Sequence, residues 1–141
     1  MSLSVGALQS VPRPLALRHA YRHLYRTGLQ AIRYAKPQRY VLRGILRSSF
    51  RKDPPSEFDP QRIVNTLAFL RLSSASASTE HKIVKNLLHV RFWQQPGTRK
   101  TGSIFDSVSM SAERSTMRAH AYGPFEKTLY MLNESLGLCL R

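Results

Sequence analysis

The chain has 141 residues, of which 42% are apolar, so it can form one small domain but not two independent cores. It carries 22 Lys or Arg against 8 Asp or Glu, a formal net charge of +14, and no apolar run approaches the length of a transmembrane helix. The single cysteine, Cys139, excludes an intramolecular disulfide framework and a cysteine-rich zinc site.

Residues 1–13 form a serine-rich segment that contains no acidic residue. The segment lacks the long apolar stretch and the small-residue cleavage site of a secretory signal. Read together with the arginines that follow it, the segment is similar to a mitochondrial import segment, and a flexible terminus is the alternative. We therefore expect the folded domain to begin at residue 14.

The first predicted helix covers residues 15–34, because apolar side chains recur there at steps of three and four residues. Pro14 precedes it and fits the first turn of a helix, where its missing N–H is harmless. Arginines follow one another at steps that nearly complete whole turns, which places them along one face. This cationic stripe consists of Arg18, Arg22, Arg26 and Arg33.

The second predicted helix begins at Pro37 and ends near residue 51. Asp53 and the two prolines after it end this helix, because proline cannot continue a helix and also restricts the residue before it. Apolar residues occupy one side of the helix. Arginine recurs every four residues along the other side, at Arg39, Arg43, Arg47 and Arg51.

The charge is concentrated in these two helices. Residues 1–52 contain 11 of the 22 basic residues and none of the acidic ones. A solvated charged face normally mixes both signs, so it is the less favoured interpretation here. The excess instead favours a polyanionic partner: a nucleic-acid backbone, an anionic lipid or an acidic protein surface.

Two ordinary amphipathic helices are predicted next. Asp59 followed by Pro60 is typical of a helix start, with Asp as the N-cap and Pro in the first turn. Thr79 can cap a fourth helix that reaches about Trp93. Residues 95–123 are polar and show no sustained period, so we interpret them as an exposed loop, and residues 125–140 as a final helix.

No segment alternates as a half-buried strand with hairpin signals, so the predicted fold is all-α. Short connections favour antiparallel neighbours, hence a small antiparallel bundle of three to four helices. We place this bundle in residues 14–95 and assign residues 96–141 to an extended loop with a C-terminal tail helix. Gly28 and Gly44 are expected to face the bundle interior, where they could leave room for an alkyl chain.

No catalytic or metal-binding constellation is found. The eight carboxylates are scattered, and residues 97–103 carry Ser103 where a phosphate-binding loop requires lysine. His19 and His23 lie one turn apart among arginines, which favours surface residues over a metal site. Cys139 has no activating partner nearby in sequence. We therefore expect an interaction protein, not an enzyme, with no catalytic residue and no metal.

Two motifs in the basic helices carry a resemblance. Leu24-Tyr25-Arg26 stands midway along the first predicted helix, and the second predicted helix ends in Leu46-Arg47-Ser48-Ser49-Phe50-Arg51. The tripeptide, the basic second helix and a phenylalanine at a suitable distance together resemble the LYR-motif family of small mitochondrial helical proteins. The resemblance covers about residues 15–95 and leaves both ends of the chain outside it.

This resemblance implies a three-helix core in the mitochondrial matrix that binds mitochondrial acyl carrier protein. That acidic partner would supply an acyl chain on its own 4′-phosphopantetheine, so no covalently bound cofactor is expected on this chain. The implied carrier-binding residues are Arg22, Tyr25, Arg26, Arg43, Arg47 and Arg51. Leu24, Gly28 and Phe50 would shape the core and the tunnel for the acyl chain, and the alternative is that they are ordinary core residues and a tight helix contact.

Members of this family act as adaptors in the assembly of respiratory complexes, iron–sulfur clusters and the mitochondrial large ribosomal subunit. Basic residues beyond the bundle suit a ribosomal RNA neighbourhood, namely Arg99, Lys100, Arg114 and Arg118. The favoured function is therefore an assembly or anti-association factor of the large subunit, with a further assembly factor as an additional partner. The alternatives are a respiratory-complex or iron–sulfur assembly factor or accessory subunit, and a constitutive ribosomal or RNA-binding protein without an acyl partner.

Overall fold

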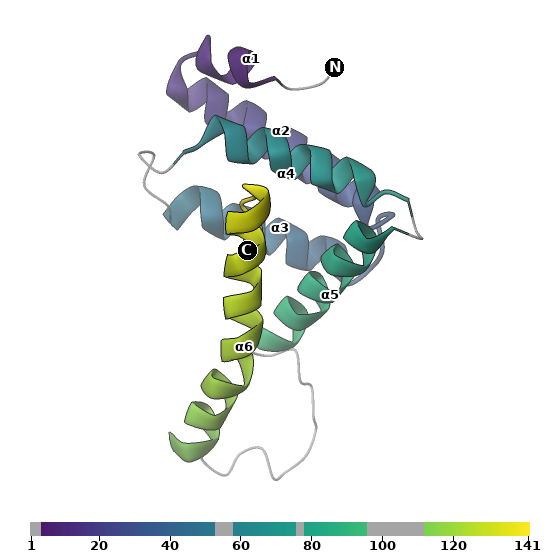
Figure 1. Cartoon of the computed structure of the whole chain (residues 1–141), viewed down its shortest axis with the longest axis vertical. Helices are drawn as coiled ribbons and strands as arrows, with labels where there is room; N and C mark the ends of the chain where they lie inside the picture. Colours follow the sequence, from purple (N-terminus) through teal and green to yellow (C-terminus); the bar gives the residue numbers. More distant parts are fainter. Residues whose placement is uncertain (1–3, 53–57, 76–77, 96–111) are drawn as a thin grey trace.

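The computed structural model describes residues 4–52, 58–75, 78–95 and 112–141 of the chain (Figure 1). These residues form helices and the turns between them, with no strand, which confirms the all-α prediction. None of the described helices combines the length and the apolar character needed to cross a membrane. The helices are α1 (Val5–Gln9), α2 (Arg13–Ala31), α3 (Gln38–Lys52), α4 (Pro60–Leu72), α5 (Thr79–Gln94) and α6 (Ala112–Leu136).

The helix ends follow from local hydrogen bonding. Asp59 caps α4 as predicted, because its carboxylate accepts hydrogen bonds from the N–H groups of Gln61 and Arg62. The cap of α5 is Ser78 and not Thr79, since the Ser78 hydroxyl accepts the N–H of His81 at 3.1 Å. Thr79 is instead the first residue of the helix.

The first basic helix ends earlier than its sequence pattern predicts. Helix α2 stops at Ala31, and Arg33 and Tyr34 then adopt left-handed backbone angles, with φ of 52° and 57°. The Tyr34 N–H donates to the carbonyl of Leu29 at 2.9 Å, which closes the helix end. Few non-glycine residues adopt this conformation, so the composition of the turn does not reveal it.

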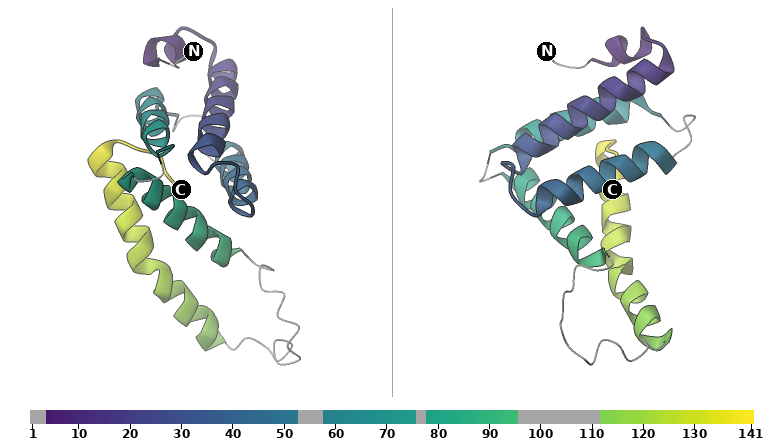
Figure 2. Two further views of the ribbon diagram at one scale, coloured as in Figure 1. Left: turned by 90° about the vertical axis from the view of Figure 1, so that its right-hand side faces the viewer. Right: turned by 180° about the vertical axis from the view of Figure 1, so that it is seen from behind.

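Four helices form a ring. Helix α2 packs on α3 and α4, and both of these pack on α5, whereas α3 and α4 make little contact with each other (Figure 2). Helices α2 and α3 run antiparallel, since Gly28 lies against Leu42 and Tyr21 lies against Phe50. A Cβ atom at Gly28 would stand 2.8 Å from Leu42 Cδ2, so this glycine allows the two helices to approach closely.

Both ends of the chain add to this ring. Helix α1 begins after the cap Ser4 and packs on α2 and α4, and it buries Leu8. This short helix lies within residues 1–13, for which the sequence suggests a flexible or import segment. Helix α1 buries one leucine, so its sequence shows no repeat of apolar residues that would predict a helix.

Helix α6 includes the last twelve residues of the expected loop. Its range, Ala112–Leu136, includes residues 112–123, so the prediction of a loop there is wrong. Gly123 and Pro124 both disfavour a helix, but Pro124 removes only one backbone hydrogen bond and the helix continues on both sides of it. The first half of α6 projects away from the ring (Figures 1 and 2).

The chain turns sharply after α6. Gly137 has φ of 59°, and the N–H of Leu138 donates back to the carbonyl of Asn133 at 2.9 Å, so the predicted helix over 125–140 ends at Leu136. We call residues 138–141 the C-terminal strap. Leu138 and Leu140 of this strap are buried and join one core cluster with residues from all six helices.

Candidate functional site

A cavity of about 210 Å³ lies inside the ring of α2, α3, α4 and α5. For comparison, an engineered apolar cavity of about 150 Å³ in another protein is large enough to hold benzene. Every helix of the ring contributes apolar side chains to the wall. They are Leu17 and Leu24 from α2, Leu42, Ile45, Leu46 and Phe50 from α3, Ile63 and Leu70 from α4, and Val84, Leu87 and Leu88 from α5.

Two of these wall residues also face the surface. Leu17 and Phe50 line both the cavity and a shallow depression that is bordered by Arg18 and Arg22. The ring of Tyr21 meets the ring of Phe50 edge-on, with 5.5 Å between the ring centroids. Two guanidinium groups therefore stand outside an apolar barrier, and the cavity lies behind it. This arrangement suits a ligand in which an anionic group is joined to an apolar chain.

The predicted carrier-binding arginines are exposed on two adjacent antiparallel helices. Arg22 and Arg26 lie on α2, and Arg43, Arg47 and Arg51 lie on α3. No ion pair joins any of these five to an acidic residue in the described ranges, where the recorded pairs involve Arg62 and Arg91 of α4 and α5. The α2–α3 surface thus carries exposed cations without an ion-pair partner in the described ranges.

The predicted tyrosine belongs to the same surface. Tyr25 is half-buried, and its ring stacks on that of Tyr21, with 6.2 Å between centroids and 14° between planes. Tyr21 in turn meets Phe50, so the tripeptide of α2 is joined to the end of α3 by a row of aromatic rings. Sequence reasoning did not single out Tyr21, although its position one turn before Tyr25 was visible in the sequence.

The predicted core and tunnel residues differ in whether they line the cavity. Leu24 is buried and Phe50 is half-buried, and both line the cavity. Gly28 is buried but contacts Leu42 and does not line the cavity. Gly44 is exposed, with Gln95 Nε2 4.0 Å from a Cβ built there, so the expectation that it faces the interior is wrong. It lies on the outer face of α3, between the exposed Arg43 and the half-buried Ile45.

The residues predicted to face RNA cannot be placed in the same way. Arg99 and Lys100 lie outside the described residues. Arg114 and Arg118 belong to α6, but their side chains also lie outside the description. The RNA-facing role of all four residues stays a prediction.

Sequence reasoning missed the polar contacts that fix the C-terminal strap to α4. The Cys139 N–H donates to Thr66 Oγ1 at 3.0 Å, and Asn65 Nδ2 donates to the carbonyl of Gly137 at 3.2 Å. On α6, Asn133 donates to the carbonyl of Leu140 and accepts its N–H, at 2.7 and 3.0 Å. The strap is therefore held through its backbone, by Thr66 from far away in the chain and by Asn133 from the end of α6.

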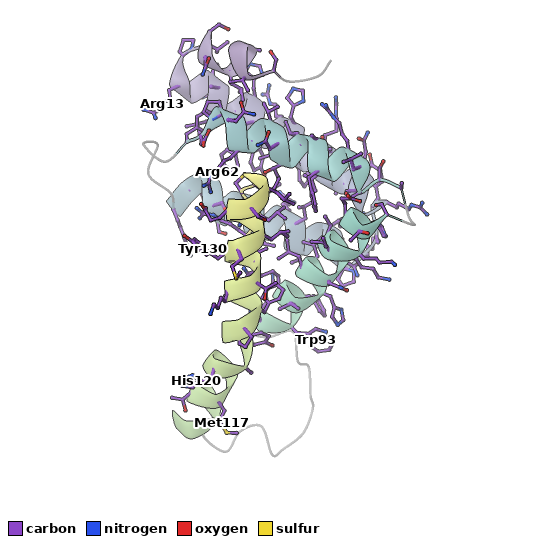
Figure 3. All side chains as sticks on the ribbon, in the orientation of Figure 1. Arg13, Arg62, Trp93, Met117, His120 and Tyr130 are labelled. Carbon is purple, nitrogen blue, oxygen red and sulfur yellow. The ribbon has the colours of Figure 1, made fainter. Side chains whose placement is uncertain are left out.

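A second set of contacts joins the ends of α4 and α6. Arg62 pairs with Glu134 at 2.9 Å, which raises the pKa of the arginine further, and Figure 3 shows Arg62 beside the C-terminal end of α6. The nearby Cys139 thiol lines the cavity, and burial raises its pKa, which disfavours the thiolate that a nucleophile needs. Its partner Thr66 Oγ1 lies 3.2 Å from the sulfur.

Metal chemistry finds no support in the described part of the chain, where no three His, Cys, Asp or Glu side chains gather at a common point. His23 on α2 has a pKa lowered by burial and then by the neighbouring His19. The histidine is thus biased towards its neutral form beside a helix face that already carries arginines.

Comparisons with known proteins place the chain in a family. No family model matches it, and no solved structure matches it significantly. It is 31% identical over 123 residues to the UPF0593 mitochondrial protein C806.05 of Schizosaccharomyces pombe, covering 86% of this chain and 94% of that protein. The name of this relative supports the mitochondrial localisation predicted from the sequence, and the matrix stays a prediction. The chain belongs to the UPF0593 family of mitochondrial proteins.

Proposed function

We propose that the chain is an LYR-type adaptor that binds acyl carrier protein in the mitochondrial matrix and accepts the acyl chain of its partner in the cavity. One observation carries this proposal: Leu17 and Phe50 line both the apolar cavity and a surface depression bordered by Arg18 and Arg22. An acyl-4′-phosphopantetheine group matches this arrangement, because it joins a phosphate to an apolar chain. The phosphate would pair with the arginines while the chain passes the barrier.

The charge of the surrounding surface supports the same partner. Five exposed arginines on α2 and α3 would face an acidic protein surface, where such charges raise the association rate and suppress wrong partners. Chain burial would add affinity, since each methylene moved out of water contributes roughly 0.8 kcal/mol. Six buried methylenes would thus contribute about 5 kcal/mol.

Co-purification tests this proposal. The tagged chain should recover acyl carrier protein from mitochondria, and Arg26→Glu should abolish that recovery because it places a negative charge against an acidic partner. Lys85→Glu is the matched control, since it makes the same charge change at an exposed position on α5. Undiminished recovery by Arg26→Glu would contradict the proposal.

The client proposed for this adaptor is the mitochondrial large ribosomal subunit, in whose assembly or anti-association it would act. Support comes from the turn between α2 and α3, which exposes Arg33, Tyr34 and Lys36, and from the exposed Tyr40 near the start of α3. The Arg39 guanidinium lies 4.7 Å from the centre of the Tyr40 ring and donates to its hydroxyl at 2.6 Å. Cations beside exposed rings suit an RNA backbone and unstacked bases.

Salt dependence tests the ribosomal client. Co-sedimentation with the large subunit should be strong at low salt and fall steeply as salt rises, because binding to phosphates releases counterions. Absence of co-sedimentation at low salt would overturn this part of the proposal.

A specific observation favours a respiratory-complex assembly factor or accessory subunit as the second candidate. Helix α6 exposes Met117, Tyr130, Met131 and Leu136, and Figure 3 shows Met117 on the half that projects from the ring. Exposed apolar side chains along one helix suit a protein docking surface better than RNA. Mass spectrometry of proteins cross-linked to α6 separates the two clients, since ribosomal proteins support the first and respiratory subunits the second.

A further inference from the structure

One side of the cavity is closed by a segment that belongs to no helix. Cys139, Leu140 and Arg141 of the C-terminal strap all line the cavity. They share the wall with residues of α3 and α4, two helices that make little contact with each other. In the left view of Figure 2 the C-terminus lies between these two helices. The last residues of the chain therefore form part of the cavity wall, beside the four helices of the ring.

The strap is fixed firmly enough to act as a wall. Asn133 holds the backbone of Leu140 with two hydrogen bonds, of 2.7 and 3.0 Å, and Thr66 holds the N–H of Cys139. Leu140 itself is 8% exposed, so its side chain points inward against the core. A side chain whose backbone is held from two helices keeps a defined position, and a change in its size therefore changes the volume of the cavity.

We propose that Leu140 is a specificity-determining residue that limits the length of the acyl chain accepted by the cavity. This inference rests on the proposed function, because it assigns an acyl chain to the cavity. Replacing Leu140 with alanine removes three carbon atoms from the wall and leaves room for a longer chain. Replacing it with phenylalanine fills the same space and shortens the chain that fits.

The chain also offers a matched control. Leu138 lies in the same strap and is 2% exposed, but it does not line the cavity. Leu138→Ala loses the same three carbon atoms from a buried position, so its general destabilisation should be comparable to that of Leu140→Ala. Only the change at Leu140 alters the wall.

The test measures chain-length preference with carrier proteins that bear acyl chains of about 8 to 16 carbons. Leu140→Ala should shift the preferred length upward by about two carbons and raise affinity for the longer chain about tenfold. Leu140→Phe should shift the preference downward, and Leu138→Ala should leave it unchanged. The same preferred length in wild type and both Leu140 variants would overturn the inference, and so would an equal shift in Leu138→Ala.

Free fatty acids of the same lengths separate this inference from the proposed function. The protein could bind no carrier and still show a longer preferred length of free fatty acid in Leu140→Ala. That result supports the strap as the wall and rejects the carrier as the partner. Carrier binding with an unchanged length preference in Leu140→Ala supports the carrier as the partner and rejects Leu140 as the residue that limits chain length. If Leu140→Ala does not fold, Leu140→Val removes a single carbon and should give a smaller upward shift. Binding of neither the free acids nor the acylated carriers would overturn both proposals.

Discussion

The backbone N–H of Cys139 donates to the hydroxyl of Thr66, 73 positions earlier in the chain, across 3.0 Å. The Thr66 hydroxyl in turn donates a hydrogen bond to the carbonyl of Arg62 at 2.7 Å. One buried threonine on α4 thereby fixes the C-terminal strap, and the strap closes the cavity. The stability of the fold and the shape of the candidate ligand site thus depend on the same hydroxyl.

Thr66→Val should destabilise the protein. Valine has nearly the same shape but cannot accept the N–H of Cys139, and a buried donor without a partner costs about 1–3 kcal/mol. Thr128→Val is the control, because Thr128 is exposed and its hydroxyl donates only to the carbonyl of Pro124 within α6. Urea denaturation measures both free energies of unfolding, and an equal, small effect of the two changes would contradict the role assigned to Thr66.

Gly28→Ala should stabilise the protein by less than the helix preference of alanine alone would give, because the added Cβ would stand 2.8 Å from Leu42 Cδ2 and the end of that leucine side chain must move aside. Gly44→Ala in α3 is the contrasting variant, since the atom nearest to its added Cβ is Gln95 Nε2 at 4.0 Å, which is an ordinary contact distance. Alanine favours a helix over glycine, so this variant should gain up to about 1 kcal/mol. Thermal unfolding of both variants checks that the gain is smaller at Gly28 than at Gly44.

Arg22→Ala should weaken binding of the carrier more strongly when its phosphopantetheine is present than when it is absent. Arg22 borders the depression outside Leu17 and Phe50, where the phosphate would lie. Loss of one charge-assisted contact should reduce affinity roughly tenfold. Arg43 does not line that depression, so Arg43→Ala should weaken the forms with and without the prosthetic group equally. Surface plasmon resonance with both forms of the carrier compares the variants, and an equal loss for both forms in Arg22→Ala would reject the phosphate contact.

The ion pair between α5 and α6 should give stability that depends on pH. A hydrogen bond from Arg91 lowers the pKa of Glu126 below its usual 4.5. Stability from this pair is therefore present above pH 4.5 and is lost as the pH falls through the lower folded-state value. Since Glu126 is 47% exposed, the contribution should be only about 0.5 kcal/mol.

Glu126→Gln removes the carboxylate and provides the measurement. The difference in unfolding free energy between wild type and Glu126→Gln should be largest near neutral pH in low salt. It should shrink with added salt, which screens the pair, and vanish in acid. A difference that stays constant from neutral pH into acid would contradict an electrostatic origin.

Local signals in the sequence account for much of the fold. Asp59 followed by Pro60 marks the start of α4 correctly, since an N-cap side chain and a first-turn proline act within one turn of helix. Periodicity likewise predicts α2 to α5 to within a few residues. It misplaces the end of α2, because the left-handed angles of Arg33 and Tyr34 are not encoded by residue type.

Contacts between distant segments account for what the sequence does not predict. Asn65 and Thr66 look like ordinary polar positions of an amphipathic helix, and only the folded chain brings Gly137 and Cys139 to them. The same holds for the cavity wall, which Leu140 lines together with residues of four helices. Sequence motifs do select Leu24 and Phe50, which line the cavity, but they give no indication that the strap closes it.

Calorimetric titration of the purified chain with acyl carrier protein tests the central claim most directly. Octanoyl carrier and unacylated carrier are compared at the same salt concentration. Burial of the chain in the cavity predicts that the octanoyl form binds at least about 100-fold more tightly, with a negative change in heat capacity. Equal affinities for the two forms, or no binding of either, would contradict the account.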